Sequence, residues 1–400
     1  MTAGNEAACR SDASATKLHP TPSTRQKLLL VTRNFPPLWG GMERLNWHMA
    51  AELSKSFEVR VIAPMGAAQH APPGVTVREA PLKPLRRFLL HAAALARREA
   101  RQWKPDIVLA GSGLTAPLAW WAARACDART AVYVHGLDLT VPHPIYRALW
   151  RPALRRMQTV IANSRATASL AKDLGIDSKR IHIVHPGVDI PEPDPTARER
   201  FRATQGIAAE TPVLLSVGRL TERKGLREFV SDVLPRLATQ CADVQLIIIG
   251  ETPSNALYAQ VQTPQSIQDA ANKAGVGRRL TFLGSVPENA LSDAYRGADL
   301  LVFPIRELPG DIEGFGMVAA EAAAHGLPTV AYALGGAVDA VADRISGRLV
   351  TAEDAQAFAE AVLETLCTPS DGNAMAAFVG KLAWPEFGRR VCAAILPTSQ

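Results

Sequence analysis

Residues 212–230, PVLLSVGRLTERKGLREFV, contain the pattern that best indicates the fold. It opens with a short run of β-prone apolar residues, turns at Gly218 and enters a helical pattern after Gly225. A fully apolar strand that leads through a glycine turn into a helix is typical of α/β proteins, in which helices cover both faces of a parallel sheet. This unit recurs along the chain.

Further strand-like runs lie before and after this stretch, with helical patterns between most of them. They are residues 28–32, 59–63, 106–110, 130–134, 159–163, 244–250, 280–284, 300–304, 328–333 and 347–350. Four prolines between residues 186 and 195 mark a linker. The sequence therefore predicts two doubly wound, Rossmann-like α/β domains, residues 27–190 and 191–382, which face a cleft. We expect a disordered polar tail at 1–26 and a C-terminal helix and tail at 383–400, whose docking place the pattern leaves open.

The composition excludes several classes of protein. The chain has 400 residues, of which 47% are hydrophobic and 20% charged, and this suffices for one large or two medium domains. No apolar run approaches the ~20 residues of a membrane span, and the N-terminus lacks the apolar core of a signal peptide. The five cysteines are scattered, without the pairs that form a metal knuckle or a disulfide framework. We expect a soluble, cytoplasmic protein.

The charge is divided unevenly between the two halves. Residues 1–194 hold 26 Lys and Arg against 15 Asp and Glu, whereas residues 195–400 hold 18 against 23. A uniformly basic nucleic-acid-binding protein would not be divided in this way. Two interpretations stay open, a chance surface imbalance and a pair of unlike domains of which one faces an anionic partner.

Ligands of such sheets bind beyond the carboxyl ends of the strands, so the segments after strands are the candidate sites. Gly40 and Gly41 follow the first strand, where the chain turns into a helix, and glycine lets backbone amides approach a ligand. Two prolines in this turn argue against a dinucleotide-binding fingerprint. The alternative is a tight turn without function.

A histidine follows the strand at 130–134. His135, with Gly136 and Asp138 after it, can hydrogen-bond a substrate hydroxyl or stabilise developing charge. A lone histidine is more often a satisfied polar residue, but its place in the predicted cleft favours the substrate role.

Two cations lie five residues apart where the second domain begins. Arg219 and Lys224 flank a helix start and suit a diphosphate, since arginine offers a bidentate fork and lysine a point charge. An ordinary solvated loop is the alternative.

The segment DIEGFGMVAAEAAAHGLPTVA, residues 311–331, carries two glutamates eight residues apart. Glu313 precedes a Gly-Phe-Gly turn, and a helix is predicted from Gly316 or Met317. Glu321 then lies about one turn inside that helix among alanines, where a carboxylate is costly unless it accepts hydrogen bonds. Sugar hydroxyls would supply them, while the free amides of the helix start would face an anion. Two unrelated surface carboxylates are the alternative, which the alanine-rich context disfavours.

Seven motifs occur in order along the chain. They are Phe35-Pro-Pro-x-x-Gly-Gly-x-Glu43, His135-Gly-x-Asp138, Ala162-Asn163-Ser164, Pro186-Gly-Val-Asp189, Gly218-Arg219…Lys224-Gly225, Phe282-Leu-Gly284 and Glu313-x7-Glu321. Together they resemble the retaining glycosyltransferases of family GT4, which have the GT-B fold and include bacterial phosphatidylinositol mannosyltransferases and many polysaccharide glycosyltransferases. The resemblance covers about residues 28–395.

The resemblance implies that the second domain binds a GDP- or UDP-linked hexose, with mannose slightly favoured, and that the first binds a lipid-linked or saccharide acceptor of cell-surface polysaccharide or glycolipid synthesis. The implied catalytic residues are His135 beside the anomeric centre, Arg219 and Lys224 on the leaving diphosphate, and Glu313 on the donor sugar. The implied donor-binding residues are Gly40, Gly41, Gly218, Phe315, Gly316, Met317, Val318 and Glu321, the last on the ribose hydroxyls; Glu43 and Asp138 would line the acceptor side.

The family retains anomeric configuration, by front-face attack in which the departing phosphate takes the acceptor's proton. Neither a metal nor another cofactor is implied, and the chain shows no Asp-x-Asp metal motif. Three departures stand out: residues 250–253 replace the usual Gly-x-Gly-Pro, His185 and Pro186 replace Pro-Asn, and an extended loop, IRELPGDIEG, carries Glu313.

Residues 83–104 form a basic amphipathic pattern, with seven Lys and Arg against Glu99. The residues Leu85, Phe88, Leu89, Ala92 and Leu95 can share one helical face. Peripheral docking on the anionic inner face of the cytoplasmic membrane is one interpretation, and burial of the apolar side in the helix's own domain is the other.

Two other classes of protein explain less of the chain. A nucleic-acid-binding protein predicts aromatic residues interleaved with the basic stretch, which has only Phe88 and Trp103, so we expect no nucleic-acid partner. A nucleotide-sugar epimerase leaves the basic first domain unexplained.

Overall fold

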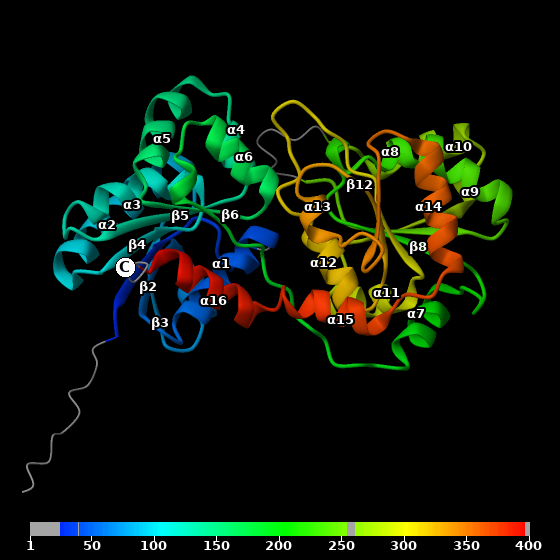
Figure 1. Cartoon of the computed structure of the whole chain (residues 1–400), viewed down its shortest axis with the longest axis horizontal. Helices are drawn as coiled ribbons and strands as arrows, with labels where there is room; N and C mark the ends of the chain where they lie inside the picture. Colours follow the sequence, from blue (N-terminus) through cyan, green and yellow to red (C-terminus); the bar gives the residue numbers. More distant parts are fainter. Residues whose placement is uncertain (1–24, 39, 254–260, 397–400) are drawn as a thin grey trace, which may run out of the picture.

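The computed structural model describes residues 25–38, 40–253 and 261–396. Two α/β domains lie side by side, each a sheet covered by helices (Figure 1). The predicted tail at 1–26, except its last two residues, falls outside the described residues, as do the last four residues of the chain.

The first domain holds a seven-stranded sheet in the order β3-β2-β1-β4-β5-β6-β7, and every pair is parallel. Its strands are β1 (Lys27–Val31), β2 (Glu58–Pro64), β3 (Val75–Ala80), β4 (Ile107–Ala110), β5 (Arg129–Val134), β6 (Thr159–Ala162) and β7 (Ile181–Ile183). Its helices are α1 (Gly41–Leu53), α2 (Leu85–Trp103), α3 (Ala116–Ala123), α4 (Leu137–Thr140), α5 (Pro144–Arg156) and α6 (Arg165–Asp173). The apolar patterns of the sequence did not predict the two edge strands, β3 and β7.

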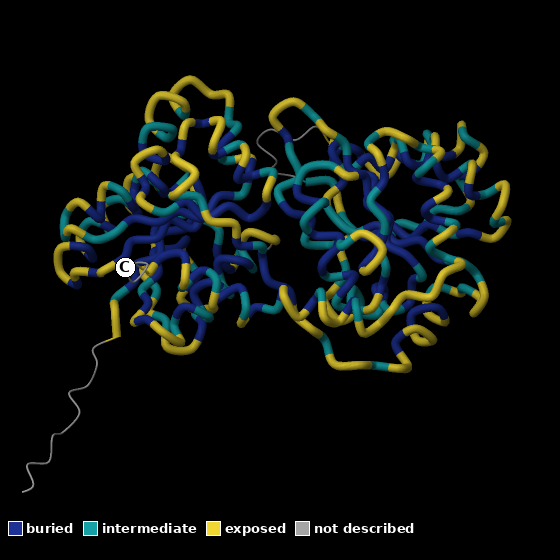
Figure 2. The backbone as a smooth tube through the Cα atoms, viewed as in Figure 1, coloured by how far each residue is buried: buried dark blue, intermediate teal, exposed yellow. Residues whose placement is uncertain are grey.

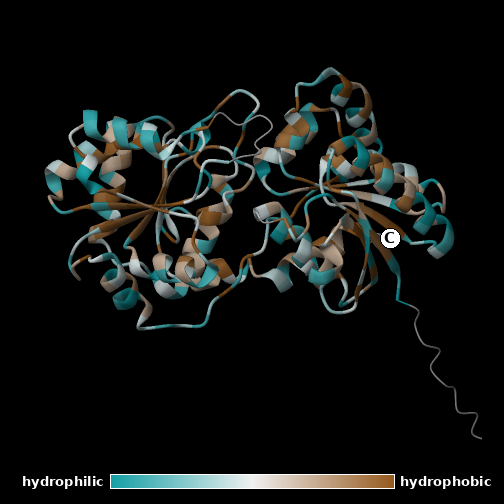
Figure 3. Cartoon of the chain, turned by 180° about the vertical axis from the view of Figure 1, so that it is seen from behind, coloured by the Kyte–Doolittle hydropathy of each residue, from teal (hydrophilic) through white to brown (hydrophobic). Residues whose placement is uncertain are grey.

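Both faces of this sheet are buried, as the apolar strands predict. Leu28 and Leu30 of β1 pack into the core on one face, and Leu29 and Val31 pack into the core on the other. This follows from the alternation of side chains along a strand. The inner strands of both sheets are among the most buried and most hydrophobic parts of the molecule (Figures 2 and 3).

The second domain holds a six-stranded parallel sheet in the order β10-β9-β8-β11-β12-β13. Its strands are β8 (Val213–Val217), β9 (Gln245–Ile249), β10 (Leu280–Gly284), β11 (Leu300–Phe303), β12 (Thr329–Tyr332) and β13 (Gly347–Val350). Its helices are α7 (Ala197–Gln205), α8 (Leu226–Glu228), α9 (Leu234–Gln240), α10 (Pro264–Lys273), α11 (Glu288–Gly297), α12 (Met317–Ala324), α13 (Ala337–Ala340), α14 (Ala355–Cys367) and α15 (Gly372–Gly380). All six strands lie where the sequence predicts them.

The C-terminal helix α16 (Trp384–Ile395) returns to the first domain, which settles where it docks. It packs against α1, and the ring of Trp384 stacks on His48 with centroids 3.9 Å apart. The chain therefore crosses between the domains twice. The two crossings touch, because the amide of Val188 donates to the carbonyl of Leu382 at 2.7 Å.

Helix α2 packs on its own domain. Phe88 and Ala92 are fully buried in the core beneath the sheet, whereas Leu90 is 72% exposed among the basic residues of the outer face. Glu99 is buried and pairs with Arg60 and Arg78 of neighbouring strands. Of the two interpretations of this helix, burial of the apolar side in its own domain is the one that the structure shows for Phe88 and Ala92. No helix within the described residues is long and apolar enough to cross a membrane.

Candidate active site

The two domains meet at the loops that follow their central strands. After β5 comes the segment His135–Gly136, and after β11 comes the loop that carries Glu313. A side chain on Gly314 would overlap the carbonyl oxygen of His135, so the glycine permits this close approach between domains. A Cβ on Gly136 would lie 3.2 Å from Ile312 of the same loop.

Two helix starts face one another at this junction. Helix α1 begins at Gly41 and α12 begins at Met317, and a Cβ on Gly41 would lie 3.2 Å from the Met317 sulfur. Gly316 supplies the left-handed turn, φ 94°, that starts α12 where the sequence predicts it. Because the first amides of a helix lack intrahelical partners and carry partial positive charge, this junction suits an anion.

The two residues predicted on the acceptor side have polar partners of their own. The side-chain amide of Asn34 donates to Glu43 at 2.8 Å. The carboxylate of Asp138 accepts from the backbone amides of Gly113, His135 and Gly136 at 2.7, 3.0 and 3.1 Å. Asp138 thus ties the loops after β4 and β5 together.

The imidazole of His135 is oriented by the backbone. Its Nε2 lies 3.0 Å from the carbonyl oxygen of Gly111. Because a carbonyl oxygen only accepts, Nε2 carries the proton, and Nδ1 is the acceptor in the neutral ring. His135 can therefore accept a hydrogen bond from a hydroxyl through Nδ1.

The cations of the second domain differ in their surroundings. Arg219 is exposed at the end of β8 and forms no ion pair or hydrogen bond with the other described residues. Lys224 lies in the turn Glu222–Lys224, held by Gly225, where a side chain would be strained at φ 65° and overlap the Pro304 carbonyl. Its Nζ donates to Oε2 of Glu313 at 2.8 Å.

A second cation, not predicted from the sequence, also binds Glu313. Arg223 is 7% exposed, and it donates to Glu313 Oε2 and, at 2.9 Å, to Asp311. Burial acts to raise the pKa of Glu313, but Arg223 and Lys224 outweigh it and lower that pKa to about 2. Burial lowers the pKa of Lys224, against the opposing pull of Glu313. In the sequence Arg223 stands next to Lys224, but Asp311 and Glu313 lie 88 and 90 residues further on, so no local spacing indicated that Arg223 pairs with them.

Glu321 is paired across the domain boundary. Arg44 of α1 donates to its Oε1, and the hydroxyl of Tyr295 in α11 donates to its Oε2 at 2.9 Å. Burial raises the pKa of Tyr295 well above its usual range, which keeps this hydroxyl a donor. The sequence placed Glu321 among alanines but contained no signal for Arg44 or Tyr295, which lie 277 and 26 residues away.

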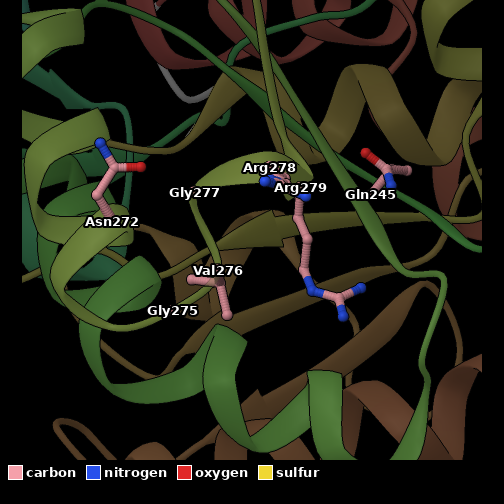
Figure 4. A pocket seen from close by; sticks show the side chains of 7 residues that line it. All are labelled: Gln245, Asn272, Gly275, Val276, Gly277, Arg278 and Arg279. Carbon is pink, nitrogen blue, oxygen red and sulfur yellow. The ribbon is translucent and has the colours of Figure 1, made fainter.

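A separate surface hollow lies away from this junction. It is lined by Gln245, Asn272 and residues 275–279 (Figure 4). Gln245 begins β9, so the hollow lies at the amino end of the sheet and does not belong to the site. Within the described residues, no group of three or more His, Cys, Asp or Glu is arranged to hold a metal.

Comparisons with known proteins identify the class to which this fold and site belong. A family model described as Glycosyltransferase Family 4 matches residues 39–192, and one described as Glycosyl transferases group 1 matches residues 211–368. In the solved structure of Anabaena HepE in complex with UDP, 99% of the chain superposes on 92% of this one, with a TM-score of 0.73 and 20% identity. The fold is that of the GT-B glycosyltransferases.

Curated relatives share more of the sequence. The GDP-mannose-dependent alpha-(1-6)-phosphatidylinositol monomannoside mannosyltransferase of Mycolicibacterium smegmatis is 31% identical over 363 residues, which is 87% of this chain and 91% of the relative. The D-inositol 3-phosphate glycosyltransferase of the same organism is 31% identical over 356 residues, 82% of this chain and 79% of the relative. The chain belongs to glycosyltransferase family 4, and it is a hexosyltransferase.

Proposed function

We propose that the protein transfers a hexose, with mannose the first choice, from a GDP- or UDP-linked donor to a lipid-linked or saccharide acceptor in cell-surface polysaccharide or glycolipid synthesis. The observation that carries this proposal is the junction of the domains, where two helix starts, two cations and two glutamates lie at the carboxyl ends of both sheets. A relative named for GDP-mannose supports the choice of mannose. The HepE complex with UDP shows a nucleoside diphosphate in a protein of this fold.

The charges of the site suggest how it binds the donor. The diphosphate lies between the helix starts and meets Arg219, whose guanidinium is exposed. The ammonium group of Lys224 binds the negative charge that develops on the diphosphate as it leaves. It therefore stabilises the transition state more than the bound substrate. The ribose hydroxyls donate to Glu321 and replace Arg44 there. The sugar hydroxyls meet Glu313, and His135 Nδ1 accepts one of them.

We propose that transfer occurs with retention and without a metal. The bond from the anomeric carbon to the phosphate oxygen breaks as the acceptor oxygen bonds to the same face, and the acceptor's proton passes to the departing phosphate. Arg219, Lys224 and the amides of α12 neutralise the charge of that phosphate. Unchanged turnover after treatment with EDTA is the expected result, and loss of turnover that added magnesium restores would contradict it.

We also propose that the first domain touches anionic membrane through the outer face of α2. The basic residues Arg86, Arg87, Arg98 and Arg101 are exposed there with Leu90. Since Phe88 is used in the core, this contact is mainly electrostatic and salt-sensitive. The protein should co-sediment with phosphatidylserine vesicles at low salt, should stay in solution at high salt, and should not bind neutral vesicles. Absence of binding at low salt would contradict the contact.

The proposed donor site is tested by thermal unfolding with UDP, GDP, ADP and their sugars, in the absence of metal. Ligands that bind only the folded state increase the free energy of unfolding by mass action, by about 2.7 kcal/mol at a hundredfold excess over Kd, and so raise the midpoint temperature. We expect one nucleotide family to shift the midpoint. Folded protein that responds to none of them would contradict the proposed site.

A further inference from the structure

Four charged side chains form a balanced cluster behind the proposed sugar site. Arg223 lies between two carboxylates: its Nε donates to Asp311 Oδ1 at 2.9 Å, and its Nη1 donates to Glu313 Oε2. Lys224 donates to the same Glu313 oxygen at 2.8 Å. The side chains of all four residues are between 8% and 14% exposed, so each charge depends on its partners rather than on water.

Two segments far apart in the sequence build this cluster. Arg223 and Lys224 are neighbours in the turn after β8, and Asp311 and Glu313 lie in the extended loop between β11 and α12. The backbone also joins the segments, because the amide of Arg306 donates to the carbonyl of Arg223 at 2.8 Å. Arg223 therefore anchors the loop from which Glu313 projects.

The two cations are not equivalent. Both bind Oε2 of Glu313, and Oε1 has no hydrogen-bond partner among the described residues. Arg223 is fixed by a second carboxylate, Asp311, whereas Glu313 is the single carboxylate that Lys224 binds within the described chain. Lys224 can leave Glu313 without giving up a second ion pair, and Arg223 cannot.

We propose that Arg223 is a positioning residue for the donor sugar. Asp311 holds Arg223, and Arg223 fixes Glu313 so that its Oε1 faces the sugar hydroxyls. Arg223 also remains the counter-ion of Glu313 when Lys224 turns to the leaving diphosphate. This inference rests on the proposed function and assigns different roles to the two neighbouring cations: Arg223 positions Glu313, and Lys224 binds the leaving diphosphate. The orientation of Glu313, and with it the discrimination between hexoses that differ at one hydroxyl, depends on Arg223.

The consequence of losing Arg223 follows from the cost of an unpaired buried charge. Without it, Lys224 is the remaining counter-ion of Glu313, so its move to the diphosphate leaves a buried carboxylate alone. Lys224 is then held back from the transition state. Arg219 and the helix amides still bind the ground-state diphosphate, so the loss falls on turnover rather than on donor binding.

The experiment compares steady-state kinetics of Arg223→Gln, Arg223→Lys and Asp311→Asn with the wild type, using the donor found in the nucleotide panel and its hexose epimers. For Arg223→Gln we expect kcat to fall about 100-fold with donor KM within about threefold, and the ratio of rates between epimers to fall. Arg223→Lys keeps the charge without the fork and should recover about tenfold. Asp311→Asn should lie between the wild type and Arg223→Gln.

The matched control is Arg227→Gln. Arg227 lies four residues further on, is 44% exposed and pairs with Glu222 and Glu228, outside the cluster. It should leave kcat, KM and the epimer ratio unchanged. The double variant Arg223→Gln with Asp311→Asn should lose no more activity than Arg223→Gln alone, because both act through Glu313.

Rates are taken per folded molecule, from the unfolding transition of each variant. Wild-type kcat and epimer ratio in folded Arg223→Gln would overturn the inference, and so would a loss of thermal stability alone. If Arg223→Gln does not fold, Arg223→Lys carries the test, with a roughly tenfold loss of kcat and a smaller epimer ratio expected. Wild-type protein that binds no nucleotide sugar would instead contradict the proposed function.

Discussion

At the scale of single residues, the site is a set of carboxylates that all have partners. Glu313 has two cations, Glu321 has an arginine and a tyrosine, and Asp138 has three backbone amides. Buried charge is costly without such partners. In the proposed donor complex, the ribose hydroxyls take the place of Arg44 as partners of Glu321.

Glu321→Ala removes the acceptors for the ribose hydroxyls. Since hydrogen bonds to a charged group contribute about 1.5–3 kcal/mol each, donor KM should rise about 10- to 100-fold while the fold persists. Initial rates against donor concentration measure this change. Glu360→Ala, an exposed carboxylate on α14, is the control. A Glu321→Ala protein with wild-type KM and turnover would show that the ribose binds elsewhere.

Lys224→Ala should lose more in turnover than in donor binding. Arg223 still compensates Glu313 in this variant, so the protein should fold. We expect kcat to fall about 100- to 1000-fold, because a fixed cation at the developing charge acts mainly in the transition state. Donor Kd from calorimetry, compared with kcat, separates the two effects. An equal loss in both quantities would place Lys224 in ground-state binding.

The sequence predicted residues at strand ends but not their long-range partners. His135, Arg219, Lys224 and Glu313 each follow a strand, and strand ends can be read from local patterns. Arg44 reaches its carboxylate across 277 residues, and no local spacing encodes such a contact. The partners of buried charges were therefore the missing part of the site.

At the scale of elements, the two strands that the sequence pattern did not predict are the edge strands of the first sheet, whereas the edge strands β10 and β13 of the second sheet were predicted. In β3 only the last of six residues, Ala80, is buried, and β7 has three residues of which two are exposed. The inner strands are apolar because helices cover both faces, so their composition identifies them. An edge strand has fewer buried neighbours and a weaker apolar pattern, and it is predicted less well.

The packing of α16 on α1 should depend on pH through His48. The pKa of His48 is lowered from 6.5 to about 4, mainly by burial; Asp189 and Glu52 oppose this shift and Arg44 contributes to it. Between pH 4 and pH 6.5, His48 is therefore protonated in the unfolded chain and neutral in the folded chain. The contribution of His48 to the free energy of unfolding is therefore constant above pH 6.5 and falls as the pH decreases towards 4.

Midpoints of thermal unfolding at pH 7.5 and pH 5 measure this effect. His48→Phe keeps a ring against Trp384 and removes the titration, so the drop between the two pH values should be smaller than in the wild type. His325 has a pKa lowered to about 4 by burial and by Arg296, so it contributes a drop of the same sign that should remain in the variant. Equal drops in both proteins would exclude His48 as a source.

At the scale of the whole molecule, several contacts among the described residues join the domains around the site, including two ion pairs and two close approaches at glycines. Arg165 at the start of α6 pairs with Asp339 at 2.5 Å, and Arg44 pairs with Glu321. The close approaches are those of Gly41 and Gly314. The mutual position of the domains thus depends on the same residues as the proposed chemistry.

Gly314→Ala should hold the domains apart without unfolding either. Its methyl group would overlap the carbonyl of His135 in the other domain and lie 2.9 Å from the Asn163 side chain. We expect kcat/KM to fall at least about tenfold, since small misplacements of reacting groups are costly, with a larger radius of gyration by X-ray scattering. Gly372→Ala, which meets open space, is the control. An unchanged radius of gyration together with unchanged activity would show that the domain junction accommodates the methyl group without moving the domains apart.

The two chain segments that connect the domains are hydrogen-bonded to each other at Val188 and Leu382, and this has a consequence for how such proteins diversify. The second domain is one continuous insertion whose ends lie side by side, while α16 completes the first domain. The inserted segment can be replaced by that of a relative without interrupting the first sheet. Under the proposed assignment, a lineage can change its donor by one exchange of contiguous sequence and keep its acceptor.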